Sequence, residues 1–211
     1  MMPIFLASYP RSGNTYLRTI LNNCFELKSA SVYPQDLGGN KNLEAYVGHI
    51  EHTNDGKIPL EPFENKALLI KTHELSSIDN KSIYVLRDAR PVALSLYNFF
   101  ERRLPLEDVI RGEHRWGKWT DHVNFWTHDL PDNRLVLRYE DLKDELGKSL
   151  KQISEFLNVE ICTTKIPPRD VISDGKWVNK EKQNWMELME KRHVELCTDI
   201  NQNLLQKYGY I

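Results

Sequence analysis

Short runs of apolar residues alternate along the chain with longer segments in which apolar positions recur at helical spacing. Four runs have the length of a buried strand: Pro3 to Ala7, Ala67 to Ile70, Ser82 to Leu86 and Leu135 to Leu137. Each run is nearly continuous in apolar character, which is typical of parallel strands covered on both faces. This alternation predicts an α/β fold, with a parallel β-sheet flanked by helices.

Two later segments are predicted to be helical. Ser149 to Leu157 places its apolar residues on one helical face. Lys180 to Leu205 is a second helical stretch, and its candidate buried positions are Trp185, Leu188, Val194 and Leu204. Ser31 to Asn65 is instead rich in Gly, Asn, Pro and Asp and has no clear period. We interpret it as loops over the face where open α/β sheets bind ligands.

Length and composition narrow the class of protein. A chain of 211 residues with 40% hydrophobic content predicts a single domain over residues 1–211. The net charge of -2, with basic residues scattered among acidic ones, gives no sign of a nucleic-acid partner. Three widely spaced cysteines argue against a disulfide framework and a zinc site. Because the sequence offers neither a signal segment nor a membrane span, we expect a cytoplasmic protein.

The most informative polar segment runs from Ala7 to Tyr16 and reads ASYPRSGNTY. It lies between the first predicted strand and a helical pattern formed by Leu17, Ile20 and Leu21. Backbone N–H groups at a helix N-terminus favour a phosphate or sulfate, and a glycine lets the backbone approach it closely. Arginine adds a forked set of donors that suits such an anion. The segment therefore predicts an anion-binding loop.

This loop differs from the nucleotide-binding pattern of ordinary kinases, because the first glycine and the lysine after Gly13 are both missing. It resembles instead the 5′-phosphosulfate loop of sulfotransferases that use 3′-phosphoadenosine 5′-phosphosulfate (PAPS), which usually reads YPKSGTTW. Arg11 stands in place of the lysine and Tyr16 in place of the tryptophan. The resemblance implies a P-loop-like sulfotransferase fold.

A second candidate segment, LIKTHE, spans Leu69 to Glu74 and ends a predicted strand. Lys71 and His73 are two residues apart and share one face of an extended chain. One side chain can neutralise a transferring anion while the other removes a proton beside it. The segment resembles the Lys-Thr-His motif of the same family, which implies that His73 is the general base and that Lys71 contacts the group in transfer.

A third segment carries Arg87 at the end of a predicted strand and Ser95 in the helix that follows, where Pro91 suits the first turn. Both side chains can converge on one anion. The spacing resembles the family's 3′-phosphate segment. Two further segments resemble the family: residues 116–126, which read WGKWTDHVNFW, and residues 138–142, which read RYEDL. Without the resemblance, the aromatic residues of the first segment would be interpreted as core residues. By resemblance, Tyr139 and Tyr16 contact the adenosine.

The C-terminal part resembles the family least. The loop that clamps the 3′-phosphate usually reads RKGxxGxW and is reduced here to SDGKW at residues 173–177, without the arginine–lysine pair. Gly175 and Lys176 are the remaining candidates, with Arg169 as a possible substitute. The family's dimer motif is not evident, so no oligomeric state is predicted.

The sequence therefore predicts a PAPS-dependent sulfotransferase that releases adenosine 3′,5′-bisphosphate (PAP), without a metal. His73, Lys71 and Arg11 are the candidate catalytic residues, with His49, His52 and His122 as alternative bases. The backbone N–H groups of Ser12, Gly13, Asn14 and Thr15 are expected to hold the 5′-phosphate. Phe99, Phe100, Trp119 and Trp126 suggest an apolar pocket for a small-molecule acceptor. Two alternatives stay open: a kinase with Thr15 and Asp141 at magnesium, and a binding module without turnover.

Overall fold

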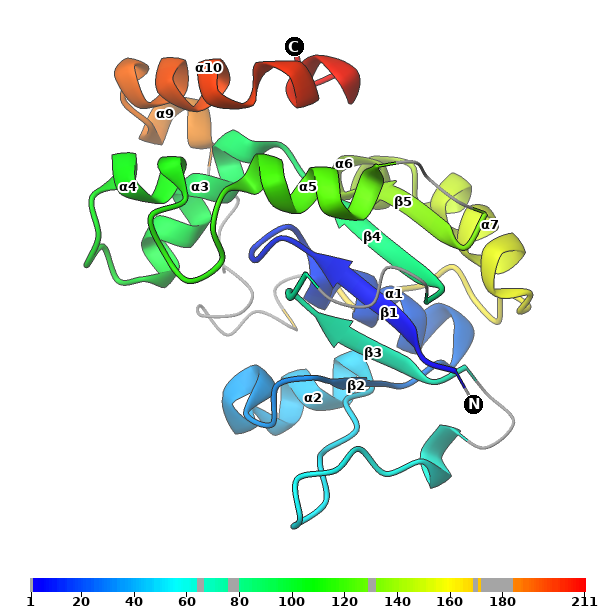
Figure 1. Cartoon of the computed structure of the whole chain (residues 1–211). Helices are drawn as coiled ribbons and strands as arrows, with labels where there is room; N and C mark the ends of the chain where they lie inside the picture. Colours follow the sequence, from blue (N-terminus) through cyan, green and yellow to red (C-terminus); the bar gives the residue numbers. More distant parts are fainter. Residues whose placement is uncertain (1, 64–66, 76–79, 129–131, 169–170, 172–183) are drawn as a thin grey trace.

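The computed structural model describes residues 2–63, 67–75, 80–128, 132–168, 171 and 184–211. Strands alternate with helices along the described chain (Figure 1). In chain order the elements are β1 (Ile4–Ser8), α1 (Asn14–Phe25), β2 (Ser29–Ser31), η1 (Asp36–Gly39), α2 (Lys41–Val47), η2 (Glu61–Phe63), β3 (Leu69–Thr72), β4 (Ser82–Leu86), α3 (Ala89–Phe99), α4 (Leu106–Arg111), α5 (Trp119–Thr127), β5 (Arg134–Arg138), α6 (Tyr139–Asp144), α7 (Leu146–Leu157), α9 (Trp185–Leu188) and α10 (Lys191–Lys207).

The described strands form one parallel sheet in the order β2-β3-β1-β4-β5. β1 is central, so its two neighbours come from later in the chain. Leu6 pairs with Lys71 on one side and with Ile83 on the other. The reversal of strand order beside β1 is where parallel α/β sheets form ligand crevices.

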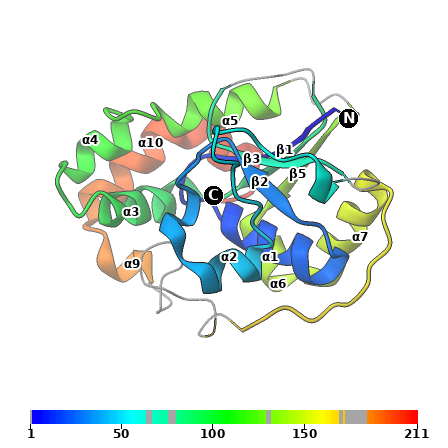
Figure 2. The same cartoon turned by 90° about the horizontal axis from the view of Figure 1, so that it is seen from below.

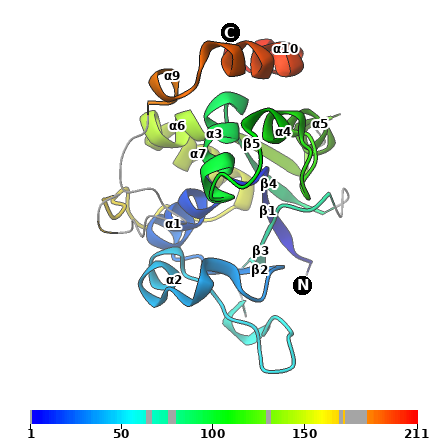
Figure 3. The same cartoon turned by 90° about the vertical axis from the view of Figure 1, so that its left-hand side faces the viewer.

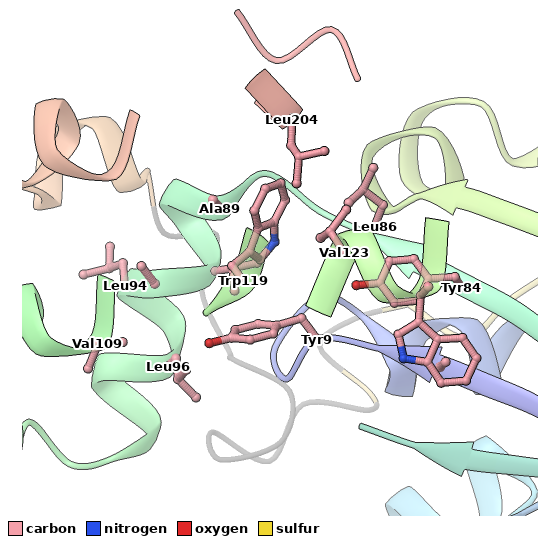
Figure 4. Close-up of a cluster of buried hydrophobic side chains, with 14 of the residues drawn as sticks. Tyr9, Tyr84, Leu86, Ala89, Leu94, Leu96, Val109, Trp119, Val123 and Leu204 are labelled. Atoms are coloured by element: carbon pink, nitrogen blue, oxygen red, sulfur yellow. The ribbon is translucent and has the colours of Figure 1, made fainter. Parts of the chain in front are cut away.

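Side chains alternate between the two faces of the sheet and supply two cores. On β1, Phe5 and Ala7 point into a core formed with α3, α4, α5 and α10, while Leu6 points into a core formed with α1, α6 and α7. Figure 4 shows the first core, where Trp119 and Val123 of α5 and Leu204 of α10 meet Tyr84 and other strand residues. The predicted α/β fold, a parallel sheet flanked by helices, is confirmed.

Several predicted boundaries differ from the observed ones. The strand predicted at Ala67 to Ile70 lies at Leu69–Thr72, because Lys71 and Thr72 continue the pairing with β1 and are buried there. The segment from Ser31 to Asn65 is not all loop, because it contains α2. That helix is only seven residues long, too short for a clear period, and its start is capped by the Asn40 side chain.

The predicted C-terminal helix is divided in two. α9 and α10 are separated by Met189 and Glu190, both in extended conformation, so one helical face does not continue through the break. Leu188 was expected to be buried but is 56% exposed, whereas Met189 is 5% exposed and packs into the core. Leu204 is buried as expected, and Trp185 and Val194 are half-buried.

The carboxyl ends of the strands meet at one edge of the molecule. The strand arrows point to the left in Figure 1, and Figure 3 turns this edge toward the viewer. The segment at residues 158–168, after α7, passes the end of α1, where the Cys162 N–H donates to the Cys24 carbonyl at 2.8 Å (Figure 2). The edge is therefore bordered by segments from distant parts of the sequence.

Candidate active site

A cavity of about 700 Å³ opens at this edge. Ten of its wall residues are predicted site residues: Arg11, Gly13, Asn14, Thr15, Tyr16, Lys71, His73, Arg87, Ser95 and Tyr139. Trp116, from the segment at residues 116–126 that resembles the family, also lines the cavity. The sequence did not single out several others: Tyr33, Gln35, Asp36, Arg115, Lys143, Ile166, Pro167 and Pro168. Trp185 also lines the cavity. The volume lies in the range of small-molecule and cofactor sites.

The predicted anion loop turns sharply between β1 and α1. Arg11 has φ 69° and Gly13 has φ 107°, so the chain uses the left-handed region twice within three residues. At Gly13 an added Cβ would lie 2.4 Å from Cδ2 of Tyr139, so only glycine lets that ring pack here. The Gly13 carbonyl accepts the first helical bond, from Leu17 at 3.0 Å. The N–H groups of Asn14, Thr15 and Tyr16 precede that bond and belong to the open helix end.

The prediction that the Ser12 N–H holds the 5′-phosphate is not supported. The Ser12 N–H donates to the Tyr9 carbonyl at 3.2 Å, and the residue is buried, so its amide holds the turn instead of facing the cavity. The Asn14 side chain also points inward, since its Nδ2 donates to the Leu6 carbonyl at 2.8 Å. The part of the predicted anion loop that stays a candidate is therefore the backbone from Gly13 to Tyr16.

Two arginines and a serine meet beside the loop. Arg11 Nε donates to Ser95 Oγ at 3.2 Å, and Arg87 Nη1 donates to the Arg11 carbonyl at 2.9 Å. The Arg87 guanidinium lies 4.4 Å from the ring centroid of Tyr139, in cation–π range. Tyr16 meets Tyr139 edge-on at 6.0 Å between ring centroids. The Arg11 side chain therefore reaches toward Ser95, the residue predicted for the other anion, and the two predicted anion sites are in contact.

His73 lies just after β3 with its ring in a fixed orientation. Its Nδ1 lies 2.7 Å from the Ser8 carbonyl, an acceptor, so Nδ1 carries the proton and Nε2 keeps a lone pair. The ring stacks on Tyr33, with centroids 5.8 Å apart and planes 28° apart. Burial and the nearby Lys71 cation lower the pKa of His73 well below its usual value, so the ring is neutral at neutral pH. This tautomer can accept a proton at Nε2.

Lys71 is buried next to an acid that the sequence did not suggest. Its ammonium forms an ion pair with Asp36 Oδ1, while Asp36 Oδ2 accepts from Arg18 Nη1 at 2.6 Å. Burial works to raise the pKa of Asp36, but the two cations outweigh it and lower the pKa to about 2. Lys71 and His73 both line the cavity, as their spacing predicts. Asp36 lies in a segment without a period, so no sequence signal marked it.

The other candidate histidines have different surroundings. His122 is 1% exposed, and its Nε2 lies 3.0 Å from the His73 carbonyl while its Nδ1 lies 2.9 Å from the Tyr84 hydroxyl. Burial lowers the pKa of His122 to about 4, so the ring is neutral, with Nε2 as donor and Nδ1 as acceptor. His49 Nδ1 lies 2.9 Å from Arg18 Nη2. Neither His49, His52 nor His122 is a wall residue of the cavity.

The predicted aromatic pocket needs correction. Trp119 and Trp126 are 5% and 0% exposed and belong to the core between the sheet and α3, α5 and α10. Trp119 is labelled in Figure 4. The helical spacing of the two residues turns them away from the cavity. Phe99 does line it, and Trp116 takes the place that was expected of the later tryptophans. Phe100 stacks on Trp116 from outside the wall, with ring centroids 5.7 Å apart.

Some predictions lie beyond the described residues. Gly175 and Lys176, like Arg169, lie outside them, so the clamp on the 3′-phosphate stays a prediction. Asp141, the acid of the kinase alternative, does not line the cavity. Within the described chain there is no group of three or more His, Cys, Asp or Glu side chains that could hold a metal ion. Among the same residues, no helix combines the length and apolar character needed to cross a membrane.

The parallel α/β sheet brings a glycine-bearing loop, two arginines and a lysine–histidine strand end to one cavity. The model of the sulfotransferase domain family matches residues 2–203, and the chain belongs to this family. Rat sulfotransferase 1A1 is 30% identical over 210 residues, which cover 87% of this chain and 68% of the rat protein. Cytosolic sulfotransferase 7 of Arabidopsis thaliana is 28% identical over 74% of this chain.

Solved structures agree on the fold. Mouse sulfotransferase SULT7A1 complexed with PAP superposes with a TM-score of 0.65 and 22% identity, over 99% of this chain and 88% of that one. A retinol dehydratase in complex with retinol and PAP has a TM-score of 0.63 and 18% identity, over 97% of this chain and 82% of that one. The chain spans 56% of the Arabidopsis relative and 60% of human sulfotransferase 4A1, which is 26% identical.

Proposed function

We propose that this chain is a PAPS-dependent sulfotransferase that transfers a sulfuryl group to a hydroxyl or amine of a small molecule and releases PAP. Residues 1–211 act as one catalytic domain, in the cytoplasm. One observation supports the proposal most. A single cavity contains the anion loop, the Arg87 and Ser95 pair, and the Lys71 and His73 strand end. A donor that carries phosphates at two positions needs two anion sites, and its transfer reaction needs a base near the reacting sulfur. All of these groups must therefore line the same cavity.

The residues on the walls fit such a donor. The N–H groups from Gly13 to Tyr16 suit the 5′-phosphate, because a helix end supplies both hydrogen bonds and the positive end of the helix dipole. Arg87 and Ser95 suit the 3′-phosphate, with Gly175 and Lys176 as further candidates. Tyr16 and Tyr139 offer an aromatic surface for the adenine, which is also the role that the family resemblance implies for them.

In the proposed mechanism His73 acts as general base. Its Nε2 takes the proton of the acceptor hydroxyl, while the Nδ1 bond to the Ser8 carbonyl holds the ring in the required tautomer. PAPS supplies the sulfuryl group, whose sulfur bonds to the acceptor oxygen as its bond to the 5′-phosphate oxygen breaks. Lys71 and Arg11 offset the negative charge that develops on the departing phosphate. The proton on His73 then passes to solvent.

The acceptor enters beside His73. Tyr33 stacks on His73, and Phe99 and Trp116 lie with ring centroids 6.4 Å apart on the same cavity wall. Aromatic walls of this kind favour a flat, apolar body with the reacting hydroxyl at its end. We therefore propose an aromatic or other apolar alcohol as acceptor.

Thermal stabilisation tests the choice of donor. PAP is expected to raise the melting temperature clearly more than ATP with magnesium at the same concentration, since a ligand that binds the folded state more tightly stabilises it more. The opposite order would favour the kinase alternative. Turnover with any acceptor would exclude the alternative of a binding module without catalysis.

A further inference from the structure

A buried carboxylate joins two cations at the wall of the cavity. Asp36 is 4% exposed, and each of its oxygens meets a different cation: Oδ1 pairs with Lys71 and Oδ2 with Arg18. Arg18 is fully buried and is fixed further by Ser29 Oγ at 2.8 Å. Lys71, by contrast, reaches the cavity. Asp36 thus links a rigid internal cation to one that faces the ligand space.

The backbone around Asp36 is held in an unfavourable conformation. Leu37 has φ 61°, in the left-handed region, and Gly38 and Gly39 follow with φ 60° and 74°. A bulky residue seldom adopts this region and persists there where the surroundings impose it. Here Leu37 is 1% exposed in a small core with Leu43 and Val47, which holds the turn. The strained turn directs Asp36 toward Lys71.

The charges around Lys71 show why an acid is needed. Burial and the cations Arg18 and Arg11 lower the pKa of Lys71, and Asp36 acts in the opposite direction. His73, which is neutral, and the Tyr33 ring, whose centroid lies 5.4 Å from Nζ, are also near Lys71. Without a carboxylate, a buried lysine beside two arginines would lose its proton readily.

We propose that Asp36 is a positioning residue, which keeps the Lys71 ammonium charged and directs it to the sulfuryl group of the donor. This inference rests on the proposed function, because it takes Lys71 to act on that group. Asp36 also lines the cavity, but its two oxygens are engaged by Lys71 and Arg18, so the role assigned to it is to act through Lys71. The charged state of Lys71, a residue of β3, therefore depends on Asp36, which lies outside that strand.

The protonation of Lys71 can be measured without turnover. Acetic anhydride reacts with the neutral amine, so acetylation followed against pH by mass spectrometry of the Lys71 peptide gives a midpoint. Asp36→Asn keeps the side-chain shape and removes the charge. We expect its midpoint to fall by about one unit or more below wild type, a roughly tenfold change in the neutral fraction at a given pH. An unchanged midpoint in the folded variant would overturn the proposal.

Arg18→Gln is the matched control, because it removes the other partner of Asp36 but leaves the Asp36 pair with Lys71. Losing a cation should leave the Lys71 midpoint unchanged or raise it. A fall in both variants would show that the midpoint does not depend specifically on the Asp36 charge, and would overturn the proposal. If Asp36→Asn does not fold, the Asp36→Glu variant is used instead. It keeps the carboxylate charge but moves it by one methylene, so it tests the position of the Lys71 ammonium.

For Asp36→Glu we expect transfer to fall about tenfold or more, with PAP affinity near wild type, because the ammonium is displaced. Wild-type transfer in that variant would overturn the proposal. The two proposals fail separately. If the wild-type protein neither binds PAP nor transfers a sulfuryl group, the proposed function fails, while the acetylation midpoints still decide whether Asp36 controls the charge of Lys71.

Discussion

Replacing His73 with alanine tests the base and leaves its surroundings largely intact. The backbone of His73 is held on both sides by other residues: its N–H donates to the Tyr33 hydroxyl at 3.0 Å, and its carbonyl accepts from His122 at 3.0 Å. Loss of the ring removes the donor to the Ser8 carbonyl, which costs about 1–3 kcal/mol of stability. The cavity should therefore keep its shape in a somewhat less stable protein.

The expected effect on catalysis is larger than the effect on binding. General-base catalysis contributes about 10²–10⁴-fold, so single-turnover transfer from labelled PAPS should slow by about 10²-fold or more. PAP affinity, measured by calorimetry, should stay close to wild type, because the imidazole is assigned to the acceptor. His52→Ala is the control, since His52 is half-buried and does not line the cavity. Near-normal turnover in the His73 variant would refute the assignment.

The pH dependence provides a second test of His73. Burial and Lys71 lower the pKa of His73, so the ring is already in its basic form at neutral pH. The single-turnover rate in wild type should therefore stay flat as the pH falls through about 6.5, the usual histidine value, and decline only at lower pH. A decline centred at or above that value would show that the base is not the neutral ring described here.

Four further predictions follow from the site. Arg87→Ala should remove most of the preference for PAP over 5′-AMP, by about 1.5–3 kcal/mol for a charge-assisted contact, in calorimetric titrations; equal preference before and after the change would contradict its role. Gly13→Ala should lower both the stability and the PAP affinity, because the added Cβ would lie 2.4 Å from the Tyr139 ring. Gly209→Ala is the control, because Gly209 has φ 70° but open space around it. Its free energy of unfolding in urea should fall only by the backbone cost of about 1–2 kcal/mol. EDTA should leave transfer unchanged, because side-chain cations supply the compensating charge, and a strict magnesium requirement would favour a kinase. Burial lowers the pKa of His122 from 6.5 to about 4, so between these pH values the unfolded chain takes up a proton that the folded chain does not. The free energy of unfolding should therefore fall by about 3 kcal/mol as the pH drops from 6.5 to 4. A His122→Gln variant should lose this dependence on pH.

The sequence was most informative where local chemistry and strand pattern agree. The run from Ser82 to Leu86 is a strand with the predicted bounds, and Arg87 and Pro91 follow it as expected at the start of α3. The i, i+2 spacing of Lys71 and His73 correctly predicted that both reach one cavity, because an extended chain repeats every two residues.

The rest depended on contacts between distant segments. Asp36 meets Lys71 only because a strained turn and a separate small core bring it there, and neither leaves a periodic pattern. Trp119 and Trp126 were assigned to the pocket because they are aromatic and lie in a segment that resembles the family, while the packing of α5 buries both. Leu188 was expected inside because a single helix was assumed, whereas the break at Met189 turns it outward.

The most direct test of the proposed function is the transfer of radiolabelled sulfur from PAPS to a panel of small phenols and apolar alcohols, measured in EDTA with the wild-type protein and the His73→Ala variant. The account predicts a labelled sulfate ester from at least one acceptor in wild type, formed together with PAP, and about 10²-fold slower formation in the variant. PAP binding without labelled product from any acceptor, or equal rates in the two proteins, would contradict it.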